Sequence, residues 1–234
     1  MSVNNTLAKS ASNKIVEYEC NGETVKISPD IIRNYLVNGT GAVSDQEIVM
    51  FLNLCRYQHL NPFLREAYLI KYGTQPATIV TGKDVFTKRA KRNKDYRGNK
   101  AGIIIQKKDG SVDKRSGTFR LADETLVGGW AEVYINGFAA PIEMTVSLDE
   151  YIGRKKDGEV NSQWSNKPAT MIRKVALVQA LREAFPEDFQ GMYSSEETGV
   201  DELPPISADE TTIIPHEEQP APPDDGIQDF FDEV

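Results

Sequence analysis

The densest group of basic side chains in the sequence is GKDVFTKRAKRNKDYRGNK, residues 82–100, in which eight of nineteen positions are Lys or Arg. Cations at this density can neutralise the phosphates of a nucleic acid, and each such contact releases condensed counterions. An ordinary solvated helix mixes Glu with Lys, whereas only Asp84 and Asp95 offset this run. At helical spacing Phe86 and Ala90 form a narrow apolar stripe with cations on several sides of it. The run therefore favours the binding of a polyanion over a solvated helix face.

The charge of the chain is divided between a basic part and an acidic end. The formal net charge is -8, yet residues 183–234 hold sixteen Asp or Glu and no Lys or Arg. Residues 1–182 therefore carry 27 basic and 19 acidic side chains, a net charge of +8. This asymmetry is typical of a nucleic-acid-binding body with an acidic extension, and a chance distribution of surface charge is the alternative.

Turn and capping signals predict an α+β fold, with a small antiparallel sheet and a hairpin flanked by helices. Asn21-Gly22 separates two alternating runs and predicts a tight hairpin. Ser44 begins a capping box ahead of a buried helical pattern, and Ser147 begins a similar box. A second hairpin is predicted at Asn136-Gly137, and a long helix is predicted to begin at Pro168.

Three parts of the chain are predicted. Residues 1–27 form an N-terminal extension, residues 28–197 form the folded core, and residues 198–234 form an acidic, Pro-rich tail. The tail has too few apolar side chains to offset its chain entropy, so disorder is predicted. No apolar run is long enough to span a membrane, and two cysteines without a signal peptide are typical of a reducing cytoplasm.

The sequence lacks the residue patterns of common enzymes. It has no G-x-x-x-x-G-K-[ST] phosphate loop and no G-x-G-x-x-G dinucleotide pattern. His59 and His216 are the only histidines, and the carboxylates before the tail are too scattered for a two-metal nuclease. We therefore expect a binding protein without a cofactor or a bound metal, not an enzyme, and we expect His59 to cap or pack.

The helical pattern at residues 168–185 is apolar almost all round, which predicts a buried helix. Arg173, Lys174 and Arg182 nevertheless project from it in three directions. A buried cation needs a partner, so these side chains pair with carboxylates, extend to solvent, or line a groove entered by an anionic strand. The sequence has no motif for reading base edges, which favours sequence-independent binding to a nucleic-acid backbone with strong salt dependence.

Three blocks of the sequence resemble the Redβ/RecT family of phage single-strand annealing proteins, and most of all its branch of phage recombination proteins called Bet. LNPFLREAYLIKY (residues 60–72) is similar to the family's Leu-Asn-Pro block. IVTGKDVFTKRAKRNKDYRG (79–98) is similar to its Gly-x-Asp helix start, with Val85 where a Gly is common. QWSNKPATMIRKVALVQALREAFPEDFQGMYSSEE (163–197) is similar to its Trp-x-x-x-Pro helix and Gly-x-Tyr ending. With the strands between them, the resemblance covers residues 28–197.

The resemblance implies a Redβ/RecT-like fold, distantly Rad52-like, whose core binds and anneals DNA in the cytoplasm of a bacterial host. It implies that the protein coats single-stranded DNA and pairs it with a complementary strand without ATP, through an annealed duplex intermediate. Family members form rings or helical filaments, act beside a phage exonuclease and a host single-strand binding protein, and need no membrane. By position, Arg65, Lys88, Arg173 and Arg182 match basic positions of the blocks. The full set of predicted DNA contacts is Arg65, Lys83, Lys88, Arg89, Arg92, Lys107, Lys108, Arg154, Lys155, Arg173, Lys174 and Arg182.

Several alternatives stay open at the level of sequence. The protein could instead be a DNA- or RNA-coating protein that does not anneal, or a nuclease or nuclease-associated subunit. Trp164 either stacks on a base or packs in the core. The tail departs from the family pattern, and its tip, DDGIQDFFDEV, resembles the tails of bacterial single-strand binding proteins. The tail therefore docks a host partner, competes with DNA for the basic groove, or only keeps the protein in solution.

Overall fold

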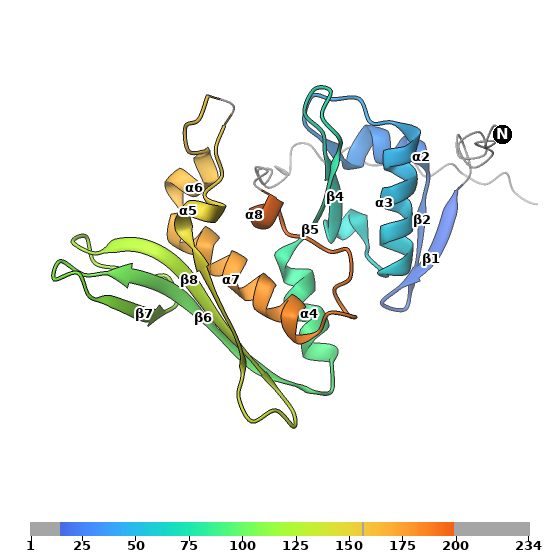
Figure 1. The fold of residues 1–234 in the computed structure, drawn as a ribbon. Helices are drawn as coiled ribbons and strands as arrows, with labels where there is room; N and C mark the ends of the chain where they lie inside the picture. The colour runs from blue at the N-terminus through green and yellow to red at the C-terminus, as the bar shows by residue number, and fades with distance from the viewer. Residues whose placement is uncertain (1–14, 156, 199–234) are drawn as a thin grey trace, which may run out of the picture. The chain divides into compact units, whose positions relative to one another are not determined.

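Residues 15–155 and 157–198 are described by a computed structural model (Figure 1). They belong to the unit that comprises residues 1–203. The predicted N-terminal extension is described from residue 15 onward, and the acidic tail from residue 199 onward lies outside the described residues, together with the hypotheses about it. In the described part, no helix has the length and apolar character needed to cross a membrane.

The described residues form an α+β fold with small antiparallel sheets and flanking helices, as the sequence predicted. The helices are α2 (Pro29–Ile31), the π-helix η1 (Ile32–Leu36), α3 (Asp45–Tyr57), the 3-10 helix η2 (Pro62–Leu64), α4 (Lys83–Arg92), α5 (Leu148–Tyr151), α6 (Ser162–Asn166), α7 (Pro168–Ala184) and α8 (Ser195–Thr198). The strands are β1 (Val16–Cys20), β2 (Glu23–Ile27), β3 (Val37–Asn38), β4 (Ala67–Ile70), β5 (Thr78–Thr81), β6 (Tyr96–Gln106), β7 (Val112–Ser116), β8 (Thr125–Ile135) and β9 (Ile142–Ser147).

Local signals explain where the N-terminal elements begin and turn. The predicted hairpin is confirmed: β1 pairs antiparallel with β2, and Asn21 and Gly22 take positive φ angles of 55° and 85° in the turn. The capping box of α3 is also confirmed, because Ser44 Oγ accepts from the Glu47 N–H at 3.3 Å while the Glu47 carboxylate accepts from the Ser44 N–H at 2.8 Å. The second predicted box is wrong. Ser147 makes no side-chain cap, since it is still part of β9 and α5 lasts one turn.

Two larger sheets support the rest of the fold. β3, β4 and β5 form one sheet in that order, with β3 parallel to β4, and β7, β6, β8 and β9 form an antiparallel sheet in that order. The predicted hairpin at Asn136-Gly137 is confirmed as an antiparallel pairing of β8 with β9, but its second strand begins at Ile142 rather than at Phe138, so residues 136–141 connect the strands in place of a two-residue turn. Helix α7 lies across one face of the four-stranded sheet (Figure 1). It comes so close that a Cβ on Gly129 would lie 2.5 Å from the Ile172 carbonyl oxygen, so this position requires glycine.

Helix α7 is buried along most of its length, as its apolar pattern predicted. It packs against β6, β8 and β9 on one side and against α4 on another. Trp164 in the preceding helix α6 is only 2% exposed, and a Cβ on Gly153 would contact its indole ring at 2.8 Å. The packing role of Trp164 is therefore confirmed, and stacking on a base is excluded by its burial.

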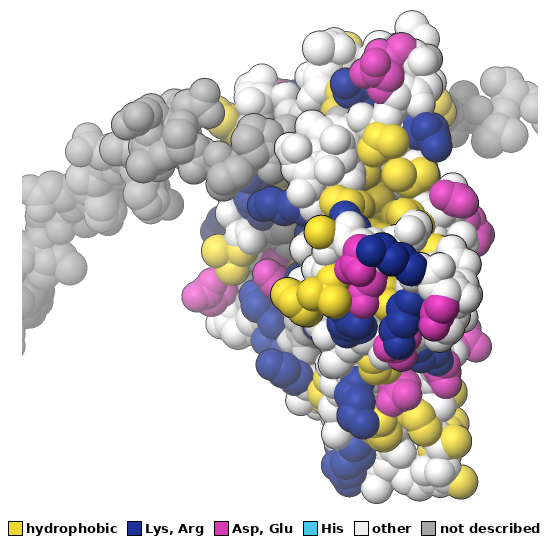
Figure 2. Space-filling view, turned by 90° about the vertical axis from the view of Figure 1, so that its left-hand side faces the viewer, with side chains coloured by type: hydrophobic (Ala, Val, Ile, Leu, Met, Phe, Trp, Pro, Cys, Tyr) yellow, Lys and Arg dark blue, Asp and Glu magenta, His cyan; other side chains and the backbone are white. Residues whose placement is uncertain are grey.

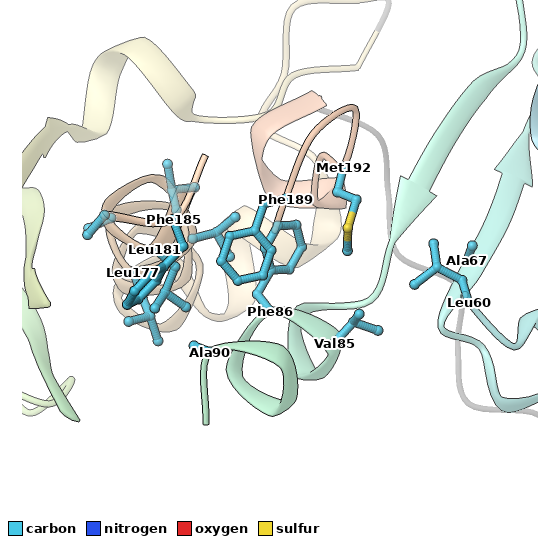
Figure 3. Close-up of a cluster of buried hydrophobic side chains, with 14 of the residues drawn as sticks. Leu60, Ala67, Val85, Phe86, Ala90, Leu177, Leu181, Phe185, Phe189 and Met192 are labelled. Atoms are coloured by element: carbon cyan, nitrogen blue, oxygen red, sulfur yellow. The ribbon is translucent and has the colours of Figure 1, made fainter. Parts of the chain in front are cut away.

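Residues 185–198, called the C-terminal segment below, follow α7 in the chain and contact α4 and β5. Phe189 packs against Phe86 of α4 with 5.3 Å between ring centroids, and both rings face α7 in the same apolar cluster (Figure 3). The Thr81 N–H at the end of β5 donates to the Tyr193 carbonyl at 2.8 Å. Phe86 and Ala90 are fully buried here. The narrow apolar stripe of the basic run is thus the docking face of α4, and its cations occupy the other sides.

Candidate nucleic-acid interface

A cleft of about 400 Å³ lies where η2 and β4, the start of α4 and the first half of α7 meet. Its lining comes from all three sequence blocks described above. The lining residues are Leu64, Arg65, Glu66, Tyr68, Gly82, Lys83, Asp84, Val85, Lys88 and Lys174. Four of them, Arg65, Lys83, Lys88 and Lys174, are predicted DNA contacts. With two carboxylates in the same lining, the formal net charge of the cleft is +2.

The turn that carries Arg65 is held against the start of α4. Arg65 takes a left-handed backbone conformation, with φ 55°, and its N–H donates to the Pro62 carbonyl at 3.0 Å. The Gly82 N–H donates to the Glu66 carbonyl at 3.1 Å, and a Cβ on Gly82 would lie 2.9 Å from the Arg65 carbonyl oxygen. Any side chain at position 82 would therefore push this turn away from α4. This contact brings the Leu-Asn-Pro block and the Gly-x-Asp helix start to one cleft.

Two lysines of α4 line the cleft, Lys88 with an exposed side chain and Lys83 with a half-buried one that is 30% exposed. Lys88 Nζ lies 3.4 Å from the Glu66 carboxylate, and its side chain is 58% exposed. Lys83 Nζ lies 2.9 Å from the carboxylate of Asp84, whose side chain is 79% exposed. The hydrogen bond from Lys83 holds the pKa of Asp84 below its usual value, so this carboxylate is ionised near neutral pH. The carboxylate of Asp84 is exposed, so its pair with Lys83 contributes little to stability and exchanges readily for another anion. The Glu66 carboxylate is buried, and its contact with Lys88 is the longer of the two.

Lys174 has two environments. It lines the cleft, and its Nζ also lies 2.7 Å from the carboxylate of Glu196 in α8. The Glu196 side chain is 1% exposed and the Lys174 side chain 17% exposed. A carboxylate that is buried to this extent requires a cation beside it. Lys174 therefore holds the C-terminal segment in place as well as contributing charge to the cleft.

Arg89 lies one residue after Lys88, but its side chain makes hydrogen bonds to other parts of the fold. Its guanidinium donates to the side-chain and main-chain oxygens of Gln58 at the end of α3, and to the Asp188 carbonyl at 2.8 Å. Burial lowers the pKa of Arg89, and the Asp188 carboxylate opposes this shift. An arginine remains a cation over the accessible pH range. Arg89 therefore joins α3, α4 and the C-terminal segment through hydrogen bonds.

The other two predicted cations of α7 are also bound within the protein. Arg182 donates to the Glu197 carboxylate at 2.6 Å and lies over the Tyr193 ring, 4.5 Å from its centroid. Arg173 Nε donates to the Ala101 carbonyl of β6 at 3.3 Å. Of the alternatives left open by the sequence, pairing with carboxylates holds for Lys174 and Arg182, and Lys174 in addition lines a cleft.

The remaining predicted contacts lie at the end of α4 and in exposed turns and loops. Arg92 donates to the Asn21 side-chain oxygen at 2.6 Å, beside the first hairpin. The other four lie in the β6–β7 turn and in the loop after α5. Their partners are Asp113 for Lys107, Asp123 for Lys108, the Gly158 carbonyl for Arg154 and Glu159 for Lys155. Figure 2 shows one face on which Lys and Arg side chains extend over much of the surface with Asp and Glu among them.

Sequence reasoning missed the carboxylates that decide which cations are available. Glu66, Glu196 and Glu197 all stand inside the quoted blocks, but nothing in their spacing shows which lysine or arginine each one meets. It also missed the apolar wall of the cleft, Leu64. His59 was expected to cap or pack: its side chain is exposed rather than packed, and its Nδ1 lies 2.7 Å from the Glu19 carbonyl oxygen of the first hairpin.

The fold and the cleft together define an α+β protein that presents a cluster of cations on an open surface. The sequence model of the RecT family matches residues 23–213, which is most of the chain. The chain therefore belongs to the RecT family, and the resemblance found in the three sequence blocks is confirmed.

One curated relative is 30% identical over 141 residues, an uncharacterized protein of Ureaplasma parvum serovar 3. The alignment covers 60% of this chain and 55% of the relative, so the chain spans about half the length of the curated relative it matches.

Proposed function

We propose that the protein binds single-stranded DNA through the basic cleft and anneals it to a complementary strand without ATP. The observation that carries the proposal is the convergence of Arg65, Lys83, Lys88 and Lys174 around one open cleft, although Arg65 and Lys174 are 109 residues apart in the sequence. Membership of the RecT family supports the same function. The backbone phosphates are the groups that such cations recognise.

The expected binding mode follows from the chemistry of the cleft. Cations that hold phosphates position a strand without reading its sequence. Four phosphate contacts per subunit predict that the logarithm of the affinity falls with the logarithm of salt concentration with a slope of about -3. The bases stay accessible for pairing, and base pairing itself supplies the free energy of annealing. A nucleotide-hydrolysis site is then unnecessary.

The other predicted contacts take different roles in this proposal. Arg89, Arg173 and Arg182 position the elements around the cleft rather than binding phosphate, because their guanidinium groups donate to protein acceptors. The exposed cations at the end of α4 and in the turns add long-range attraction for a polyanion. They are Arg92, Lys107, Lys108, Arg154 and Lys155.

We further propose that subunits assemble into a ring or a helical filament, so that successive clefts follow one strand. A phage exonuclease that supplies single strands and a host single-strand binding protein are the partners expected with this function. Particle images of the protein with and without complementary oligonucleotides test the assembly: closed or open repeating arrays support it, and isolated subunits on DNA contradict it.

An annealing assay tests the function directly. Two complementary labelled oligonucleotides are mixed with the protein in the absence of ATP and of divalent metal. The proposal predicts pairing faster than the spontaneous rate. Binding without any acceleration would instead identify a protein that only coats single strands, and loss of label from a strand on addition of metal would identify a nuclease.

A further inference from the structure

Two large apolar side chains stand exposed beside the cations of the cleft. Leu64 is 62% exposed and belongs to the cleft lining, and Phe63, its neighbour in η2, is 41% exposed. Both follow Pro62, which is buried. An exposed apolar pair costs hydration free energy, so its position next to a charged cleft calls for an explanation.

Hydrogen bonds within the turn that contains Phe63 and Leu64 fix the exposure of this pair. The Asn61 side chain accepts from the Phe63 N–H at 3.0 Å, and the Asn61 carbonyl accepts from the Leu64 N–H at 3.2 Å. The buried Glu66 carboxylate in turn accepts from the Asn61 N–H at 2.9 Å. These bonds fix the backbone of the turn, so Phe63 and Leu64 are held outward rather than drawn into the core.

Glu66 also links the apolar pair to the cations. Its carboxylate fixes the Asn61 end of the turn at one oxygen and contacts Lys88 Nζ at the other. The turn then ends at Arg65, which lines the same cleft as Leu64. An apolar surface and a set of phosphate-binding cations are therefore held side by side through one buried carboxylate.

We propose that Phe63 and Leu64 contact the bases of the strand whose phosphates occupy the cleft. This inference rests on the proposed function. A nucleotide offers an anionic phosphate and an apolar base face, which match the cations and the exposed apolar pair respectively. Contact between bases and aromatic side chains stabilises a bound single strand and tolerates any sequence. It is present only when bases are unpaired, so it favours single strands over the duplex product.

The test separates base contacts from charge by using two ligands of equal charge. One is an oligothymidine, and the other is an oligonucleotide of the same length in which every base is absent. Wild-type protein is expected to bind the oligothymidine at least tenfold more tightly. In the variant Phe63→Ala with Leu64→Ala this ratio should fall toward one, while affinity for the abasic strand stays unchanged.

A matched control is available in the loop after β7. Phe119 and Leu121 are also exposed, at 69% and 50%, and do not line the cleft. The variant Phe119→Ala with Leu121→Ala should keep the wild-type ratio. Equal loss in both variants would show a general effect of apolar surface and overturn the inference.

Failure of the inference and failure of the proposed function give different results. If wild-type protein binds both ligands equally, base contacts are absent and the inference is wrong, while phosphate binding stands. If it binds neither, the proposed function fails and the inference with it. If the Phe63 and Leu64 variant changes the oligomeric state and keeps the wild-type ratio of affinities for the two ligands, the apolar pair contacts a second copy of the chain and the inference is again wrong. The wild-type comparison alone can overturn the inference even if the variant does not fold.

Discussion

Lys88 and Arg89 are neighbours in the sequence, yet the structure uses them in opposite ways. The Lys88 side chain is 58% exposed and reaches the cleft through a long contact of 3.4 Å with Glu66. Arg89 is half-buried and donates to acceptors on α3 and on the C-terminal segment. A high density of charge in this helix therefore does not show which of its cations can contact a ligand. Burial and the partners of each cation decide whether it is held within the fold or stays available to a ligand.

The difference follows from the geometry of α4. Arg89 lies three residues after Phe86 and four after Val85, so it shares the side of the helix that packs into the core. Lys88 lies four residues after Asp84, which is exposed at the start of the helix. A shift of one position thus moves a cation from the protein interior to the cleft.

The largest expected effect is a loss of stability on replacing Arg89, compared with the exposed Arg92 of the same helix. Arg89→Ala should lower the free energy of unfolding by about 3 kcal/mol, because it leaves carbonyls of Gln58 and Asp188 without their donor. Arg92→Ala, at an exposed position with one neighbouring amide, should cost less than about 0.5 kcal/mol. Urea unfolding measures both. A stable Arg89→Ala protein that has lost DNA binding would place Arg89 among the DNA contacts.

Lys174 belongs both to the cations that line the cleft and to those held within the fold, since it lines the cleft and also pairs with buried Glu196. Lys174→Ala should lower both DNA affinity and stability, the latter by about 2 kcal/mol, because it leaves a buried carboxylate without its cation. Adding Glu196→Gln should restore most of the stability and none of the affinity. Recovery of both properties together would show that Lys174 acts on DNA only through the fold.

Glu47 gives the corresponding comparison among carboxylates, because its half-buried side chain accepts several hydrogen bonds whereas Asp84 is exposed. The hydrogen bond from Lys71, more than any other contact, lowers the pKa of Glu47 to about 2. The unfolded chain therefore binds a proton at higher pH than the folded protein does. Stability from this group is complete above about pH 5 and is lost as the pH falls toward 2.

Glu47→Gln should cost about 1.5 kcal/mol at pH 7, because a charged acceptor of several donors is removed. The variant should also lose less stability than wild type between pH 5 and pH 3. Urea unfolding at the two pH values provides the measurement. Parallel losses in wild type and variant would assign the acid sensitivity to other groups.

The smallest effect is expected at the exposed β6–β7 turn. Lys107 and Lys108 pair with Asp113 and Asp123 at 3.3 and 3.4 Å, with all four side chains open to solvent. Replacing both lysines by Gln should change the free energy of unfolding by less than about 0.5 kcal/mol. Thermal or urea unfolding at moderate salt is sufficient, and a larger loss would reveal a structural role for this turn.

Local chemistry made much of the fold predictable. Asn21-Gly22 and Asn136-Gly137 specify hairpin turns, and Ser44 with Glu47 specifies the start of α3, because each signal acts within four residues. The Ser147 signal failed because the strand before it continues through that serine. Burial of α7 was also predictable, since its apolar residues surround the helix and leave no solvent face.

The candidate site was predictable in part. The basic run located α4, and the resemblance added Arg65 and the cations of α7. Which of them are free to meet a ligand depends on contacts across long sequence separations. Lys88 meets a carboxylate 22 residues earlier, and Lys174 meets one 22 residues later. Such partners are chosen by packing of the whole fold, which residue types and spacing do not encode locally.

The central claim is that the cleft, rather than the overall positive charge of the body, binds DNA. Two charge-matched variants test it most directly: Lys83→Gln with Lys88→Gln, and Lys107→Gln with Lys108→Gln. Affinity for a labelled oligothymidine is measured for each over a range of salt concentrations. The cleft variant should lose at least about tenfold in affinity at low salt, and its salt slope should shrink by about 1.4, whereas the turn variant should stay close to wild type. Equal losses in the two variants, or wild-type affinity in the cleft variant, would contradict the claim.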